Sequence, residues 1–427
     1  MTDKTDVLEA LKHSNVFLTG GAGVGKSYIT NEIIKEYRSR AKQVVALGST
    51  GVSAVNIGGF TIHSFFVFGI SSNFEELNQS DKRAKKRLMD LKKVLKATDL
   101  IIIDEISMVS ADLLDMIAYR LNNYGYLGKV LFVGDFFQLP PVQKNNRNDV
   151  FGEKLYAFES MAWERFDLMV IELTEMKRTT DAEFTHILSK VRKGVCDEEV
   201  IHYMTRLWNN EKMQKEPTYL YGRNLEVEQT NRAKLNALET EETILFANVE
   251  MFGSVHEKKL ATWKNMLPIS EQLTLKEGVP ILFTVNKWGK FVNGERGILR
   301  KIEEDHLIVE KEEEYVRVER HAFDLVDMLV KEDGTIETIN LATLSQFPLK
   351  LAYAVTIHKS QGMSIDNLVC NVDNIFAPSQ FYVAISRAIN PKNLKLDFSK
   401  GDLTQYLRRV VHVDDRVIEY YKNMKSL

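Results

Sequence analysis

A glycine-rich segment near the start of the chain carries the residue types of a phosphate-binding loop. Residues 20–27 read GGAGVGKS and lie between the apolar run at residues 16–18 and a helix-like stretch. Backbone N–H groups freed by glycines can surround phosphate oxygens, a lysine can neutralise phosphate charge, and a hydroxyl can hold Mg²⁺. The alternative is a loop that merely turns the chain, which the flanking strand and helix disfavour. We predict a nucleoside triphosphate site formed by Gly21, Ala22, Gly23, Val24, Gly25, Lys26 and Ser27, with Ser27 as a metal ligand.

A pair of acidic residues follows another apolar run. Asp104 and Glu105 come directly after residues 100–103, which read LIII. Beside a bound nucleotide, one carboxylate can hold Mg²⁺ and a second can polarise the attacking water. An isolated acidic pair is also typical of a helix N-terminus. Because Lys26 precedes the pair, we expect Asp104 to hold the metal and Glu105 to act on water.

Three further side chains are candidates for contacts to the terminal phosphate. Gln138 follows the apolar run at residues 130–133, where its hydrogen bonds would change when the phosphate leaves. Arg178 and Arg387 are the candidates for stabilising charge on the transferred phosphoryl group. From the residues alone, either arginine could equally form a surface ion pair.

The elements that must position these residues are short apolar runs separated by helical patterns. The runs lie at residues 16–19, 43–47, 100–103, 130–133 and 168–173. This alternation is typical of a parallel sheet with helices on both faces. Ligands of such sheets bind beyond the carboxyl ends of the strands, where the phosphate loop would lie.

Length and composition limit the class of protein. A chain of 427 residues predicts about two to four domains. Its 44% hydrophobic and 27% charged residues are typical of a folded protein. Its net charge of -3 provides no overall positive charge that would attract nucleic acid. The two cysteines lack metal-ligand spacing, and no leader or membrane-spanning run is recognisable. We therefore expect a cytoplasmic protein with no membrane partner.

Two segments differ from the rest of the chain in composition or in residue pattern. Residues 82–96 are rich in lysine and arginine, which indicates either a solvated helix face or a contact with a phosphate backbone. Residues 276–345 read as short alternating strands, such as 307–309 and 315–318, with turns at Asn293-Gly294 and Asp333-Gly334. We interpret this second segment as a small β-module inserted into a second α/β domain.

The ordered set of motifs resembles that of superfamily 1 helicases. Their 5′-to-3′ branch, the RecD and Dda type, is the nearest, and within it the Pif subgroup. The resemblance spans roughly residues 14–395 and rests on GGAGVGKS at 20–27, GSTGVSA at 48–54, TIHSF at 61–65, DEISM at 104–108, GDFFQLP at 134–140, NGERG at 293–297, LAYAVTIHKSQG at 351–362 and YVAISR at 382–387.

The resemblance implies an α/β fold of two RecA-like P-loop motor domains with a small SH3-like β insertion in the second. Domain 1A would cover residues 1–175, with a short 1B insertion around 69–96. Domain 2A would cover 176–275 and 346–427, and the SH3-like 2B module 276–345. Arg178 and Arg387 would reach the γ-phosphate from 2A, and Gly362 would approach the nucleotide. The implied cofactors are ATP and Mg²⁺.

The implied activity is that of an ATP-dependent 5′-to-3′ DNA helicase, acting as a monomer on single-stranded DNA and on fork or structured DNA. The resemblance assigns the DNA track to Thr50, Thr61, His63, Ser64, Thr356, His358 and Ser360, each of which could instead be an ordinary cap or core contact. Phe65, Phe66 and Phe136 could stack on bases or belong to the core.

Several alternatives stay open at this point. An RNA helicase and a protein-remodelling P-loop ATPase would share much of the nucleotide site. Residues 1–19 lack the glutamine with which such helicases usually read adenine, which puts strict ATP preference in doubt. The 1B segment shows no long β-hairpin with an aromatic tip. We propose the basic run of residues 82–96 as a contact to the duplex ahead.

Overall fold

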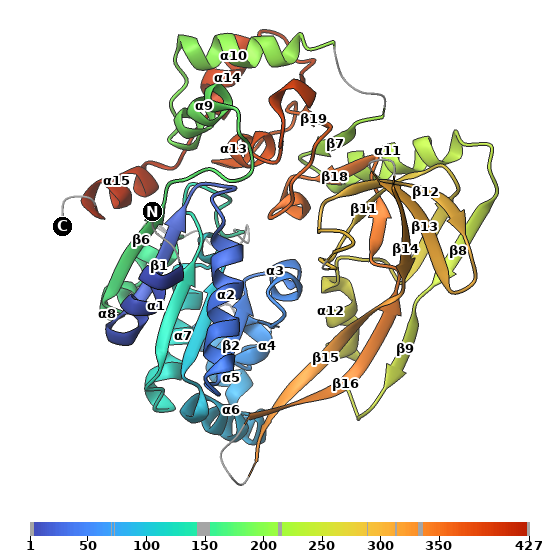
Figure 1. The fold of residues 1–427 in the computed structure, drawn as a ribbon. Coiled ribbons are helices and arrows are strands. Elements are labelled where there is room, and N and C mark those ends of the chain that lie inside the picture. The colour runs from blue at the N-terminus through green and yellow to red at the C-terminus, as the bar shows by residue number, and fades with distance from the viewer. Residues whose placement is uncertain are drawn as a thin grey trace. The chain divides into compact units, whose positions relative to one another are not determined.

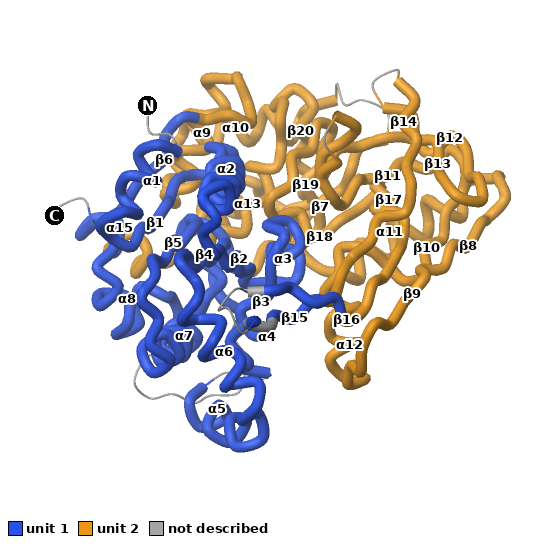
Figure 2. Tube along the Cα trace, turned by 60° about the horizontal axis from the view of Figure 1, so that its bottom comes forward, with its two compact units in different colours: residues 1–175, 326–340, 420–427 blue, residues 176–325, 341–419 orange. Residues whose placement is uncertain are grey.

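The computed structural model describes residues 4–69, 71, 73–142, 154–211, 216–287, 289–311, 314–331 and 336–424. The chain divides into two compact units, which Figure 2 shows in different colours. Unit 1 comprises Met1–Glu175, Val326–Asn340 and Tyr420–Leu427, and unit 2 comprises Met176–Leu325 and Leu341–Glu419. No helix in the described ranges is long and apolar enough to cross a membrane.

Unit 1 is built on a six-stranded parallel sheet (Figure 1), whose strand order β3-β2-β4-β5-β1-β6 can be followed by the labels in Figure 2. All five predicted strands are present. The strand β3 was not predicted, because two residues are too few to show a periodic pattern. The strands are β1 Asn15–Gly20, β2 Val44–Gly48, β3 Phe60–Thr61, β4 Leu100–Asp104, β5 Lys129–Val133 and β6 Leu168–Leu173.

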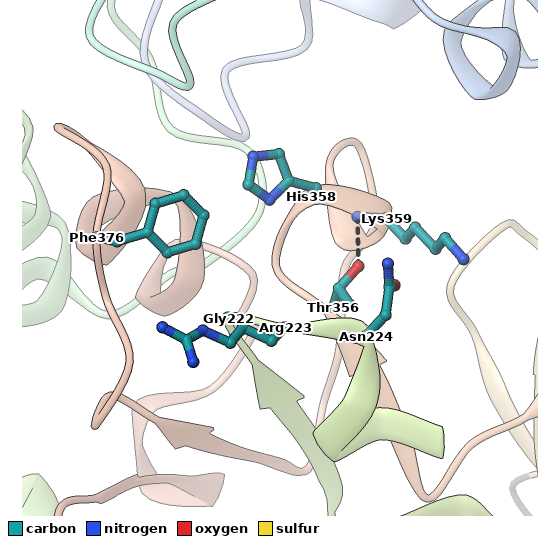
Figure 3. Close-up of a pocket in the computed structure, with 7 residues that line it drawn as sticks. All are labelled: Gly222, Arg223, Asn224, Thr356, His358, Lys359 and Phe376. Atoms are coloured by element: carbon teal, nitrogen blue, oxygen red, sulfur yellow. Dashed lines mark hydrogen bonds between the residues drawn. The ribbon is translucent and has the colours of Figure 1, made fainter. Parts of the chain in front are cut away.

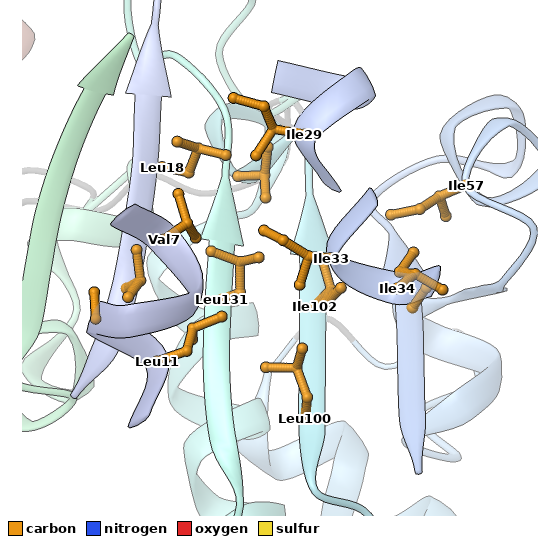
Figure 4. Close-up of a cluster of buried hydrophobic side chains, with 14 of the residues drawn as sticks. Val7, Leu11, Leu18, Ile29, Ile33, Ile34, Ile57, Leu100, Ile102 and Leu131 are labelled. Carbon is orange, nitrogen blue, oxygen red and sulfur yellow. The ribbon is translucent and has the colours of Figure 1, made fainter. Parts of the chain in front are cut away.

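The central strands of this sheet are buried on both faces, which explains their continuous apolar runs. Figure 4 shows one such face, where Ile29 and Ile33 of α2 and Val7 of α1 pack against Leu18 and Leu131 of the sheet. Burial of each such side chain contributes about 1.5–3 kcal/mol. The helical elements of unit 1 are α1 Lys4–His13, α2 Lys26–Ser39, α3 Gly51–Asn56, α4 Ile62–Phe65, α5 Phe74–Asp81, α6 Lys85–Ala97, η1 Ile106–Met108, α7 Ala111–Asn123, η2 Ala157–Glu159 and α8 Met161–Arg165.

The segment predicted as the 1B insertion contains the helices α5 and α6. The buried guanidinium of Arg120 on α7 donates to both carboxylate oxygens of Asp81 at the end of α5, over 2.6 and 2.7 Å. It also donates to the Phe66 carbonyl over 3.2 Å. The basic side chains of the 82–96 run are all exposed, as a contact with the phosphate backbone requires: Lys82, Arg83, Lys85, Lys86, Arg87, Lys92, Lys93 and Lys96.

Unit 2 contains a four-stranded parallel sheet with the order β18-β7-β19-β20. The predicted class, α/β with parallel sheets, therefore holds in both units. The strands are β7 Thr218–Tyr221, β18 Ala354–Thr356, β19 Leu368–Asn371 and β20 Leu394–Asp397. The helical elements from residue 176 on are α9 Ala182–Arg192, α10 Glu198–Trp208, α11 Asn224–Asn236, α12 Glu257–Met266, η3 His358–Ser360, α13 Gln380–Ile385, η4 Pro391–Asn393, α14 Leu403–Val410 and α15 Asp415–Met424.

Antiparallel strands fill the middle of the chain and extend on both sides of residues 276–345, so the limits and SH3-like class of the module stay predictions. Three sheets form, with the orders β14-β13-β12-β11-β17, β10-β8 and β15-β16-β9. Gly294 lies between β11 and β12 with a φ of 87°, in agreement with the predicted turn, whereas Asp333-Gly334 lies outside the described residues. The strands are β8 Glu242–Phe246, β9 Asn248–Met251, β10 Gln272–Lys276, β11 Pro280–Phe283, β12 Arg296–Ile302, β13 His306–Lys311, β14 Glu314–Glu319, β15 His321–Val330, β16 Ile336–Gln346 and β17 Leu349–Leu351.

Candidate functional site

The predicted phosphate loop joins the end of β1 to the start of α2. Gly23 and Gly25 have φ values of 82° and 94°, a left-handed conformation that glycine adopts without strain. Gly25 is the N-cap of α2 and no side chain caps this helix, so its first N–H groups face the loop. The Lys26 Nζ atom donates to the carbonyls of Gly20 and Gly21 over 2.8 and 2.9 Å. The lysine charge is thus already held over the loop in which a phosphate would lie.

Gly20 is required for another reason, the close approach of a neighbouring strand. It pairs with Leu173 of β6, and a Cβ atom at this position would lie 2.3 Å from the Leu173 carbonyl oxygen. Any side chain would push the start of the loop away from the sheet.

The predicted acidic pair lies at the end of β4. The Asp104 Oδ1 atom accepts a hydrogen bond from the Glu105 N–H over 2.9 Å. Burial, and then the negative charge of Glu105, raise the pKa of Asp104 to about 7, against the effects of that hydrogen bond and of Lys26. A desolvated carboxyl beside a second acid is suited to a cation, so Asp104 and Glu105 fit Mg²⁺. The loop around Lys26 in turn fits the phosphates of ATP. Glu105 adopts a left-handed backbone with a φ of 55°, a strain of about 1–3 kcal/mol that is typical of active sites.

Gln138 follows β5 in a buried turn. Its N–H donates to the Asp135 carbonyl over 2.9 Å, and the Phe137 N–H donates to the Asp135 carboxylate over 3.2 Å. Phe136 is 1% exposed and packs against Phe17, so it belongs to the core. Phe65 and Phe66 are likewise buried, so of the two alternatives for these three rings the structure favours the core over stacking on bases.

A C-terminal tyrosine braces this turn, which the sequence did not reveal. The Tyr421 ring stacks on Phe137 with centroids 4.6 Å apart and an interplanar angle of 14°. Its hydroxyl lies 3.0 Å from Thr19 Oγ1 and accepts a hydrogen bond from the Phe136 N–H over 3.3 Å. Tyr421 therefore joins the end of β1 to the Gln138 turn. The only signal in the sequence is the pair of tyrosines in the last helical stretch.

The predicted DNA residues of unit 1 lie at the same edge of the sheet. Gly48 pairs with Asp104 and with Thr61, which brings the ends of β2, β3 and β4 into one row. Thr50 caps α3 by accepting a hydrogen bond from the Ser53 N–H over 3.1 Å. Thr61 caps α4 by accepting from the Ser64 N–H over 3.3 Å. The Ser64 hydroxyl donates to the Thr61 carbonyl, and the His63 ring meets Phe68 edge-on.

The two predicted arginine fingers lie together in unit 2. Arg178 donates to Ser364 Oγ over 2.9 Å and to the Ser386 carbonyl over 2.7 Å. Arg387, 1% exposed, donates to the Val383 carbonyl over 2.9 Å. Burial, and then the charge of Arg387, lower the pKa of Arg178 to about 9. Two desolvated cations side by side are suited to an anionic ligand.

The remaining predicted residues surround the end of β18. The Thr356 hydroxyl accepts a hydrogen bond from the Lys359 N–H over 3.2 Å. Ser360 is fully buried, and its hydroxyl donates to the Ile357 carbonyl over 2.8 Å, so it faces the protein rather than a ligand. Gly362 has a φ of 79°. Thr356 and His358 line a pocket of about 500 Å³, whose other lining residues sequence reasoning missed: Gly222, Arg223, Asn224, Lys359 and Phe376 (Figure 3).

Comparisons with known proteins agree with this arrangement. Residues 3–201 match the model of the PIF1-like helicase family, and residues 296–424 match a second helicase family model. The ATP-dependent DNA helicase Pif1 of Campylobacter jejuni is 42% identical over 442 aligned residues, which cover 100% of this chain and 98% of that protein.

Solved structures of Pif1 proteins are also similar to this chain. The crystal structure of Bacteroides sp Pif1 in complex with ADP-AlF4 has a TM-score of 0.84 and 26% identity, over 100% of this chain and 97% of that one. Bacteroides Pif1 bound to ssDNA has a TM-score of 0.67 at 26% identity, over 99% and 96% of the two chains. The predicted pair of RecA-like α/β domains is thereby confirmed. The chain belongs to the PIF1-like helicase family.

Proposed function

We propose that this chain is an ATP-dependent DNA helicase that moves 5′ to 3′ along single-stranded DNA. The observation that carries the proposal is the common edge of the unit 1 sheet. The phosphate loop, the acidic pair, Gln138 and the first DNA motifs all follow carboxyl ends of its parallel strands. A site that joins these groups can couple hydrolysis of a phosphate bond to the binding of a DNA strand.

The nucleotide would be held by the loop of residues 21–27, with Lys26 neutralising phosphate charge. Bound ATP supplies the phosphoryl group whose transfer to water releases the free energy for movement. Ser27 and Asp104 would hold Mg²⁺, Glu105 would orient and deprotonate the water, and Gln138 would report loss of the phosphate. We assign the stabilisation of transferred charge to Arg178 and Arg387.

The DNA track would use Thr50, Thr61, His63 and Ser64 in unit 1, and Thr356 and His358 in unit 2. Hydroxyls of this kind contact the phosphate backbone without reading sequence, and imidazoles can contact phosphates or bases. Ser360 would support the motif from within, because its hydroxyl is already bonded to Ile357. We further propose that the protein acts as a monomer on fork or structured DNA.

The proposal is tested by measuring ATP hydrolysis with no nucleic acid, with single-stranded DNA and with RNA of the same sequence. We expect stimulation by DNA and loss of turnover in Lys26→Ala. Equal or greater stimulation by RNA would favour an RNA motor. Turnover that no nucleic acid stimulates would favour a protein-remodelling ATPase.

A further inference from the structure

The pocket in unit 2 lies where ligands of parallel sheets bind. Its lining comes from the residues after β7, from the end of β18 with η3, and from the loop after β19. These three strands are neighbours, in the order β18-β7-β19, and are parallel. The pocket therefore occupies the carboxyl edge of the sheet.

One wall of the pocket is aromatic and uncharged. Phe376 is 64% exposed, so its ring is open to a ligand. The His358 ring lies near it, with centroids 6.3 Å apart and an interplanar angle of 19° (Figure 3). Burial lowers the pKa of His358, which favours the neutral imidazole. A flat, neutral wall of this kind is suited to stacking of a nucleobase, since every base has a π face.

Phe376 is exposed but its backbone is fixed. The N–H groups of Phe376 and Ala377 donate to the Gln380 side-chain oxygen over 2.9 and 3.2 Å, and Gln380 is fully buried. The Asn374 side chain in the same loop donates to Glu226 of α11. The ring is thus presented by a braced loop, which reduces the entropy cost of ordering it on a ligand.

Two cationic side chains, Arg223 and Lys359, also line the pocket. Figure 3 shows the Arg223 guanidinium on the Phe376 side of the pocket and the Lys359 side chain directed to the other side. Within the described part of the chain, neither side chain forms a salt bridge with a carboxylate. Arg223 is also the N-cap of the 13-residue helix α11, whose positive end lacks a side-chain cap. Cations beside an aromatic wall match a base and its phosphate.

We propose that this pocket binds one unpaired nucleotide of the DNA strand, with its base on Phe376 and His358 and its phosphate on Arg223. The subsite deepens the proposed function and rests on it. Because stacking uses the π face that every base has, we expect the subsite to accept any base.

The test is the affinity of the whole 427-residue chain for a labelled single-stranded oligonucleotide, measured by fluorescence anisotropy at one fixed salt concentration. Because Phe376→Ala removes one stacked ring, we expect this variant to bind about 5- to 150-fold more weakly than the parent protein. Phe376→Trp should restore the affinity. Phe246→Ala is the matched control, because Phe246 is also 64% exposed and lies outside the pocket.

Oligonucleotides with a single abasic position locate the contact. An abasic site at one position of the oligonucleotide should weaken binding by the parent protein. The Phe376→Ala variant should bind that oligonucleotide and the intact one with equal affinity. Normal DNA binding by the parent with an unchanged affinity of Phe376→Ala would overturn the subsite alone. A parent protein that does not bind single-stranded DNA would overturn the proposed function and the subsite together.

Discussion

The contact of Tyr421 with the Gln138 turn yields a prediction whose size follows from the structure. Replacing Tyr421 by phenylalanine keeps the stacking on Phe137 and removes only the hydroxyl. That hydroxyl meets Thr19 Oγ1 at 3.0 Å and the Phe136 N–H at 3.3 Å, and both groups are buried. An orphaned buried donor costs about 1–3 kcal/mol.

We expect this change to appear in stability and in turnover. In a domain of about 150–250 residues, each kcal/mol lowers Tm by about 2–4 °C, which gives a total of about 2–12 °C. Since Thr19 precedes the phosphate loop and Phe136 precedes Gln138, kcat for DNA-stimulated ATP hydrolysis should also fall.

The assay is thermal unfolding together with ATPase kinetics, beside Tyr119→Phe as a control. Tyr119 is 41% exposed in the same unit, so its hydroxyl can bond to water and its removal should change neither quantity. An unchanged Tm for Tyr421→Phe would refute the bracing role. A lower Tm with unchanged kcat would confine that role to stability.

Three further predictions concern unit 1. Asp81→Ala should lower the free energy of unfolding by about 3 kcal/mol in urea titrations, because it leaves the buried Arg120 guanidinium without its carboxylate; a change below about 1 kcal/mol would contradict this. Without nucleotide, Asp104→Asn should lessen the pH dependence of Tm. Because the pKa of Asp104 is raised in the folded state, that state binds more protons than the unfolded one, and the stability of the parent protein falls as pH rises from about 4 to 7. Parallel profiles of Tm against pH for parent and variant would argue against this. An alanine variant of the basic run should bind forked DNA with a smaller dependence on salt, by about 1 in log–log slope for each phosphate that the variant no longer neutralises, and an equal slope would exclude duplex contact. Its substitutions are at Lys82, Arg83, Lys85, Lys86 and Arg87.

The sequence predicted the parts of the fold that depend on local pattern. Five parallel strands were visible because burial on both faces makes each an apolar run. The phosphate loop and the acidic pair were recognisable because their chemistry depends on adjacent residues. β3 escaped detection because it has two residues, and the limits of the β-rich region were blurred because pairing with β17 joins residues far apart in the chain.

The parts that were missed depend on contacts between distant segments. Phe376 is an isolated phenylalanine in a loop, and only the strand order brings it beside His358. Tyr421 lies 285 residues from Phe136 in the turn that it braces. Phe136 lies within a motif, but its burial against Phe17 could not be inferred from the motif itself.

The most direct test of the account is unwinding of two partial duplexes of equal length, one with a 5′ single-stranded tail and one with a 3′ tail, in the presence of ATP. We predict that the parent protein unwinds only the 5′-tailed duplex and that Lys26→Ala unwinds neither. Unwinding of only the 3′-tailed duplex would contradict the proposed direction, and ATP turnover without unwinding of either duplex would contradict the helicase activity itself.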